Sequence, residues 1–90
     1  MVTRPFTFTG SSLEINYSTS AVGSIRAELQ DAAGAPLPGY RLEESTEIIG
    51  DEIERVVGWR GGREVKALSG RTVRLRFVMK DADLFAFRFR

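Results

Sequence analysis

Ninety residues are enough for one domain, and 42% hydrophobic and 28% charged side chains are ordinary for a soluble globular protein. Thirteen basic and twelve acidic residues leave a net charge of +1, so the chain as a whole does not attract nucleic acid. The absence of Cys and His excludes disulfides, zinc–thiolate sites and any Ser-His-Asp or Cys-His arrangement within the chain. No apolar run approaches the roughly 18 residues of a membrane-spanning helix, so we expect neither a membrane nor a nucleic acid as partner.

The hydrophobic pattern is that of a sheet-forming chain throughout. Runs in which apolar and polar residues alternate lie at 5–9, 13–17, 25–29, 52–59, 72–80 and 84–90. Strand-length runs that recur about every ten residues between turn signals predict an antiparallel β-sandwich. We therefore predict one all-β domain over residues 1–90, jelly-roll-like and with about seven or eight strands.

Adjacent runs are expected to pair as two hairpins. The first joins 13–17 to 25–29 through the turn-rich residues 18–23, and the second joins 72–80 to 84–90 through 81–83. In both registers apolar residues face apolar residues, and a slip of one residue would expose the whole set. The predicted core consists of Phe6, Phe8, Leu13, Ile15, Tyr17, Ile25, Leu29, Val57, Val73, Leu75, Phe77, Met79, Phe85 and Phe87.

The outer face of these hairpins carries four arginines. The predicted registers place like charges opposite each other, which is unfavourable, so the arginines need partners. We expect a salt ladder with Glu52 and Glu54, or with Glu14 and Glu28. The alternatives are a site for an anion or a carboxylated glycan, and a docking face that uses an outward apolar strip of Val78, Leu84 and Ala86. The basic face consists of Arg74, Arg76, Arg88 and Arg90.

Glu14 and Glu28 are the only pair that could imitate a two-carboxylate hydrolytic site. Opposed on a hairpin, they would lie near the spacing of about 5 Å that retaining glycosidases use. An open sheet face, however, offers no cleft and nothing that would raise one of the two pKa values. We therefore predict that the chain is not an enzyme.

Aromatic residues near a strand end suggest a ligand site. Trp59 is the only tryptophan and ends a strand, where its ring can stack on a sugar or can belong to the core. Tyr40 is open to the same two interpretations. The candidate carbohydrate site consists of Trp59, Tyr40, Asp51 and Arg60.

Loop carboxylates provide the only oxygens that could bind a metal. Calcium needs six to eight oxygen ligands, and the spacing here matches no EF-hand loop. Asp81 and Asp83 more simply make turn hydrogen bonds. We predict no cofactor, with a structural calcium ion as the alternative. The loop carboxylates are Glu43, Glu44, Glu47, Asp51, Glu52, Asp81 and Asp83.

Four segments resemble a known family. They read NYSTSAVGSIRAELQD at 16–31, PLPG at 36–39, IGDEIERVVGW at 49–59 and VRLRFVMKDADL at 73–84. Together they resemble the C-terminal β-sandwich module of large bacterial glycoside-hydrolase-like proteins, which carry a β-propeller of sialidase or furanosidase type upstream. The chain departs from the family pattern at two points. It has Gly58 where the family has a Ser before the tryptophan, and it has Ile48-Ile49 where the family has an aromatic residue.

The resemblance implies a division of labour between this chain and a larger parent protein. The catalytic residues lie in the propeller in that family, so none is carried over to this chain. The implied role is an accessory module that packs against the propeller and stabilises it, with weak carbohydrate binding as the alternative. Self-association of the isolated chain would follow from an uncovered docking face. The resemblance also implies a secreted or cell-envelope location in a bacterium.

Overall fold

The structure, a computed structural model, describes residues 2–60 and 64–90 and contains four strands and two short 3-10 helices there. These elements are β1 (Phe6–Thr7), β2 (Leu13–Asp31), η1 (Leu42–Glu44), β3 (Asp51–Val56), η2 (Val65–Leu68) and β4 (Thr72–Phe89). All strand pairs are antiparallel, in one sheet of order β1-β4-β2-β3. The all-β prediction is confirmed, and the described residues hold no helix that is long and apolar enough to cross a membrane.

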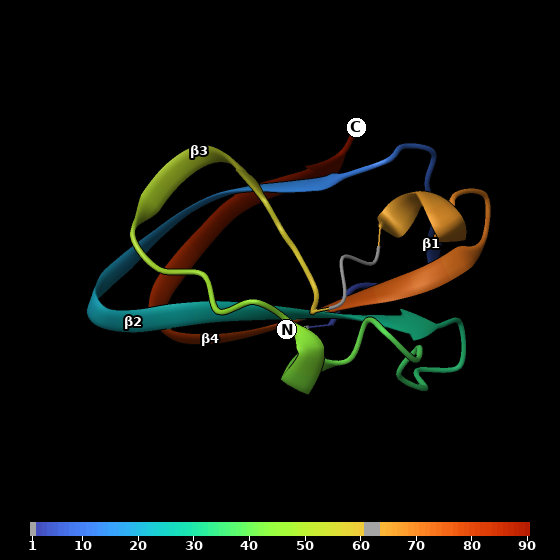
Figure 1. Cartoon of the computed structure of the whole chain (residues 1–90), viewed down its shortest axis with the longest axis horizontal. Coiled ribbons are helices and arrows are strands. Elements are labelled where there is room, and N and C mark those ends of the chain that lie inside the picture. Colours follow the sequence, from blue (N-terminus) through green and yellow to red (C-terminus); the bar gives the residue numbers. More distant parts are fainter. Residues whose placement is uncertain (1, 61–63) are drawn as a thin grey trace.

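Two very long strands form most of the sheet. β2 and β4 pair along nearly their whole length, from Leu13 opposite Phe89 to Asp31 opposite Val73. Figure 1 shows this ribbon bending back on itself, with the first part of β2 (blue) above its last part (teal) and β4 alongside both. Side chains from both halves belong to one hydrophobic core, so the bend brings the two apolar faces together.

The bend is built by an irregularity in the pairing of β2 with β4. Between Thr19 and Ser24, β2 has four residues, whereas the matching part of β4 has only Asp81, in a left-handed conformation with φ of 46°. Gly23 lies against this point. A Cβ added to Gly23 would be 2.4 Å from the Asp81 carbonyl oxygen and 2.6 Å from that of Lys80. The close approach of the two backbones therefore requires glycine.

A β-bulge in β4 changes which side chains face the core. Asn16 lies opposite Ala86 and Tyr17 lies opposite Leu84, which leaves Phe85 as the extra residue. The bulge shifts the alternation by one residue. Phe85 is consequently 64% exposed, while Leu84 and Phe87 on either side pack against the core.

The two predicted hairpins are wrong. Residues 18–23 and 81–83 form the bend of one ribbon, not two hairpin turns, and each predicted strand pairs with a strand of the other set. Tyr17 faces Leu84 where Ile25 was expected, and Phe77 faces Ala27 where Phe87 was expected. Because β2 and β4 each absorb two of the expected strands, the described residues contain fewer strands than the seven or eight predicted.

Most of the predicted core is confirmed, with two clear errors. Met79 is 37% exposed because it lies beside the bend, and Phe85 is exposed because it is the bulge residue. Phe6 and Phe87 are only partly buried and pack against the rest. The buried residues that the alternation did not indicate come from loops and η2: Tyr40, Ile48, Trp59, Val65 and Leu68.

Candidate functional site

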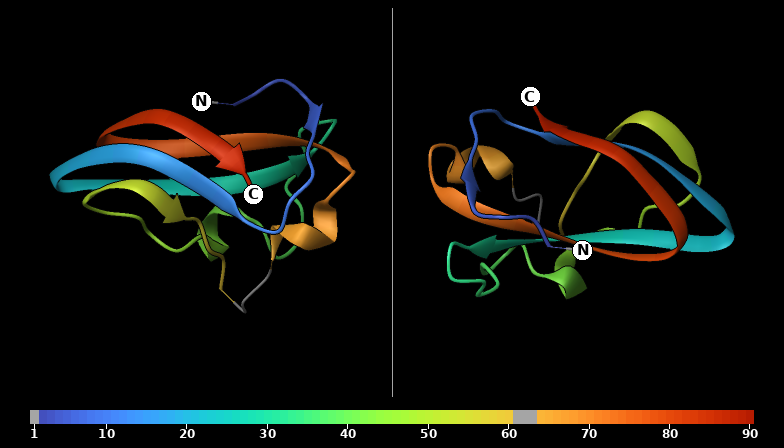
Figure 2. Two further views of the ribbon diagram at one scale, coloured as in Figure 1. Left: turned by 90° about the horizontal axis from the view of Figure 1, so that it is seen from above. Right: turned by 180° about the vertical axis from the view of Figure 1, so that it is seen from behind.

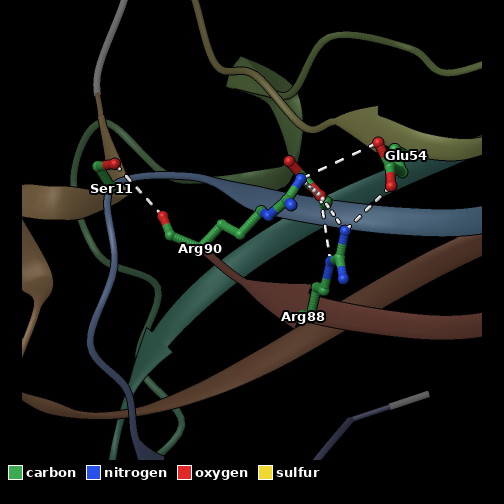
Figure 3. Close-up of polar contacts among 5 residues, drawn as sticks. Ser11, Glu54, Arg88 and Arg90 are labelled. Atoms are coloured by element: carbon green, nitrogen blue, oxygen red, sulfur yellow. Dashed lines mark hydrogen bonds and ion pairs between the residues drawn. The ribbon is translucent and has the colours of Figure 1, made fainter.

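A charged cluster lies on the outer face of the sheet, where β2, β3 and β4 run together. Glu14 is buried, and its Oε1 accepts a hydrogen bond of 3.2 Å from Arg88 Nε and lies 3.5 Å from Arg90 Nη1. Arg88 Nη2 also donates to Glu54 Oε1 at 3.2 Å, so Arg88 joins the two carboxylates (Figure 3). Two arginines therefore neutralise two glutamates here, and we call Glu14, Glu54, Arg88 and Arg90 the Glu14 cluster.

A second charged cluster lies in the other half of the ribbon around Glu28, which is only 3% exposed. Its Oε1 accepts a hydrogen bond of 2.9 Å from Gln30 Nε2 and lies 3.7 Å from Arg76 Nη1. Its Oε2 accepts a hydrogen bond of 3.0 Å from the Leu42 backbone N–H. The carboxylate therefore connects β2 with β4 and with the start of η1. Nearby, Arg74 Nε donates to the Ala32 carbonyl oxygen at 3.0 Å.

These contacts confirm the salt-ladder interpretation for Arg76, Arg88 and Arg90. The like-charge oppositions of the predicted hairpins do not occur, because Glu14 faces Arg88 and Glu28 faces Arg76 across the β2–β4 pair. The two-carboxylate site that the sequence suggested for Glu14 and Glu28 is therefore not formed. Each glutamate binds a different arginine in a different half of the ribbon. Like charges are replaced by opposite charges in register, which stabilises a strand pair.

The space beside the Glu14 cluster is a shallow hollow of about 220 Å³, between Glu14, Asn16, Glu54, Ala86 and Arg88. Its charged groups already have partners. Throughout residues 2–60 and 64–90, no buried side-chain nitrogen or oxygen lacks a hydrogen-bond partner, and no group of three or more Asp or Glu residues could hold a metal ion. The hollow thus presents no polar group that a ligand is needed to satisfy.

The predicted aromatic platform is wrong. Trp59 and Tyr40 are each only 4% exposed, so neither ring presents a face to a sugar. Trp59 Nε1–H donates to the Ala27 carbonyl oxygen at 3.0 Å, and the Tyr40 hydroxyl donates to the Glu64 carbonyl oxygen at 2.6 Å. The two rings meet edge to face with centroids 5.5 Å apart. Both are core residues whose single polar group is satisfied inside the protein.

The other two residues of the predicted carbohydrate site do not join Trp59. Asp51 begins β3, and its Oδ1 accepts a hydrogen bond of 2.8 Å from Ser18 Oγ. Arg60 follows Trp59, and its Nη2 donates to the Glu43 carbonyl oxygen at 2.7 Å. Asp51 is therefore the first residue of the six-residue β3, whereas Arg60 lies beyond its other end, and each is bound to its own neighbour.

A polar cluster that the sequence did not reveal lies beside Asp51. The Tyr17 hydroxyl lies 2.7 Å from the Ile49 carbonyl oxygen and 3.2 Å from Glu52 Oε2, which accepts a hydrogen bond of 2.9 Å from Arg55 Nη1. Burial, together with the hydrogen bond to Glu52, raises the pKa of Tyr17. Hydrogen bonds from Arg55 and Tyr17 lower the pKa of Glu52. A neutral phenol and an ionised carboxylate thus fix β2 to β3 at neutral pH.

The expected apolar docking strip does not form. Val78 lies opposite Arg26 in one half of the ribbon, and Ala86 lies opposite Asn16 in the other. Leu84 packs against the core. The bend and the bulge between these positions separate the three side chains, which a straight strand would have aligned.

Along part of its length, the outer edge of β4 has no partner strand among the described residues, and neither has the outer edge of β3 on the other side of the sheet. β1 pairs with β4 only through Phe6 and Thr7, and an isolated bridge joins Val2 to Arg76. Beyond these contacts, no described strand pairs with the outer edge of β4 at residues 82–89, which forms the border of the sheet in Figure 2. We call this stretch the open edge. It is bordered by the exposed Phe85 and by four partly buried apolar side chains, Ala82, Leu84, Phe87 and Phe89.

Comparison with protein-family models, curated proteins and solved structures finds no match for this chain. The resemblance to a glycoside-hydrolase-associated module is therefore carried by its four segments alone. A function has to be argued from the geometry of the chain itself.

Proposed function

We propose that this chain is a non-catalytic module that binds other proteins through the open edge of β4. The open edge itself is the observation that supports the proposal. An unpaired strand edge presents backbone N–H and C=O groups that another strand can pair with. The arginines of the basic face already bind glutamates or a backbone carbonyl group, and the exposed Phe85 adds apolar surface beside the edge.

The family resemblance makes this proposal more specific. We propose an accessory module of a larger glycoside-hydrolase-like protein, in which a propeller carries the catalysis and this chain packs against it and stabilises it. In that setting, the two halves of the bent ribbon are the two layers of a jelly-roll-like sandwich. A secreted or cell-envelope location in a bacterium belongs to the same proposal.

Carbohydrate binding is the weaker alternative. The rings of Trp59 and Tyr40 are covered, and the arginines of the basic face bind glutamates or a backbone carbonyl group. The hollow beside Glu14 has no exposed aromatic ring among the residues that line it, and a second hollow of about 290 Å³ beside Gly58 includes Trp59, whose ring is covered.

Backbone NMR of the whole chain tests the proposal against this alternative. Hydrogen exchange is measured at a protein concentration where sedimentation shows single chains. The amides of the open edge that point away from β2 are expected to exchange rapidly, and those of the central strand β2 slowly. A panel of neutral and acidic oligosaccharides is expected to cause no localised shifts. Slow exchange along the whole open edge in single chains would contradict the proposal. Specific shifts around Glu14, Asn16 and Glu54 would favour the sugar-binding alternative.

A further inference from the structure

We propose that the open edge pairs with the open edge of a second copy of this chain. The two β4 strands would run antiparallel across a two-fold axis between Phe85 and Ala86, which extends the sheet from one chain into the next. This inference rests on the proposed function of the open edge, and it names the partner. Three features of β4 lead to it: its unpaired acids, its apolar pattern and its bulge.

The unpaired acids are Asp81 and Asp83. Their side chains have no hydrogen-bond or ion-pair partner within residues 2–60 and 64–90. Across the proposed axis, Asp83 would lie opposite Arg88 of the second copy, and Asp81 would lie opposite Arg90. The arginine side chains are 52% and 57% exposed, and Arg88 uses Nε and Nη2 for Glu14 and Glu54, which leaves Nη1 available. Opposite charges would therefore meet at both ends of the pair.

The apolar pattern matches in the same register. Leu84 would lie opposite Phe87 of the second copy, and Ala82 would lie opposite Phe89. All four side chains point toward the core of their own chain and are only partly buried, as expected for a strand at the border of a sheet. Pairing would cover them further and would continue the hydrophobic core across the interface.

The bulge selects this register over its neighbours. Because Phe85 shifts the alternation, inward side chains meet inward ones on both sides only where the two bulges flank the axis. Sliding the strands by two residues in one direction places the inward Leu84 opposite the outward Phe85. Sliding them in the other direction places the outward Ala86 opposite the inward Phe87. Edge charges and bulges usually protect a strand from pairing. Here they would permit pairing in a single register.

Sedimentation of the whole chain tests the inference. The chain is expected to pass from one-chain to two-chain mass as its concentration rises. Asp83→Arg places arginine opposite Arg88 twice in each dimer, and we expect it to weaken association about tenfold or more. The matched control is Glu43→Arg, which makes the same change of charge at an exposed residue of η1 and is expected to leave association unchanged. Circular dichroism verifies that both variants are folded. A one-chain mass up to about 1 mM, or equal effects of both variants, would overturn the inference.

The register has its own measurement, and it separates this inference from the function on which it rests. In a mixture of labelled and unlabelled chains, isotope-filtered NMR is expected to detect contacts between the Leu84 methyl groups of one chain and the Phe87 ring of the other. A dimer without this contact would overturn the proposed pairing. A chain that stays single while its open-edge amides exchange rapidly would refute the second copy as partner and leave the edge free for another protein. Slow exchange in single chains would refute both proposals.

Discussion

Alanine substitutions at Phe77 and Phe85, made one at a time, test the course of β4 directly. A hairpin centred on residues 81–83 would bury both rings, whereas in the structure Phe77 is 1% exposed and Phe85 is 64% exposed. Removing a buried phenylalanine ring costs about 3–5 kcal/mol through lost burial and the cavity left behind. An exposed side chain away from special features contributes within about 0.5 kcal/mol. We therefore expect Phe77→Ala to destabilise the chain by about 3 kcal/mol more than Phe85→Ala.

Equilibrium urea unfolding measures this difference, at concentrations where sedimentation shows single chains. The dependence of the free energy on urea should be similar in both variants, so that the midpoints report stability. Equal and large losses would mean that Phe85 is buried and that the bulge is not where the structure places it. A loss below about 1 kcal/mol for Phe77→Ala would remove Phe77 from the core.

Three further substitutions or titrations follow from particular contacts. Gly23→Ala should cost about 1–3 kcal/mol in urea unfolding, because the added Cβ would meet backbone carbonyl groups. Gly58→Ala is the control and should cost far less, because a Cβ there would make only ordinary contacts. Equal costs would contradict the close approach of the two backbones at the bend. Glu28→Ala should cost about 1–3 kcal/mol, because it leaves a backbone N–H and an amide without their acceptor, and a neutral result would contradict that role. Tyr17 should titrate above its ordinary pKa of 10.0 in an NMR pH series, and Glu52→Gln should lower the pKa of Tyr17. Because the folded state favours the neutral phenol, the free energy of unfolding should hold below about pH 10 and fall as the pH rises through the folded-state pKa. Titration of Tyr17 at or below 10.0 would be the contrary outcome.

The sequence was sufficient to predict where most strand residues lie and which of them face the core, but not which strands pair. Alternation correctly placed Ile15, Ile25 and Leu29 in the core, because the period of two is a local property. The hairpins failed because Gly, Ser and Asp mark a reversal or a bend equally well. Burial of Tyr40 and Trp59 could not be read from their loops, since their polar groups depend on carbonyl acceptors that distant residues supply, Ala27 for Trp59 and Glu64 for Tyr40.

The charges contained a signal that the apolar pattern did not. Each predicted hairpin matched apolar residues well but placed Glu14 opposite Glu28 and Arg76 opposite Arg88. Exchanging partners between the two hairpins, as β2 and β4 do, keeps an apolar residue opposite each predicted one except Phe85, which becomes the bulge residue, and turns both oppositions into ion pairs. When apolar residues fit two registers equally, opposed charges decide between them. The same criterion favours antiparallel pairing of the open edge with a second copy, where Asp83 would meet Arg88.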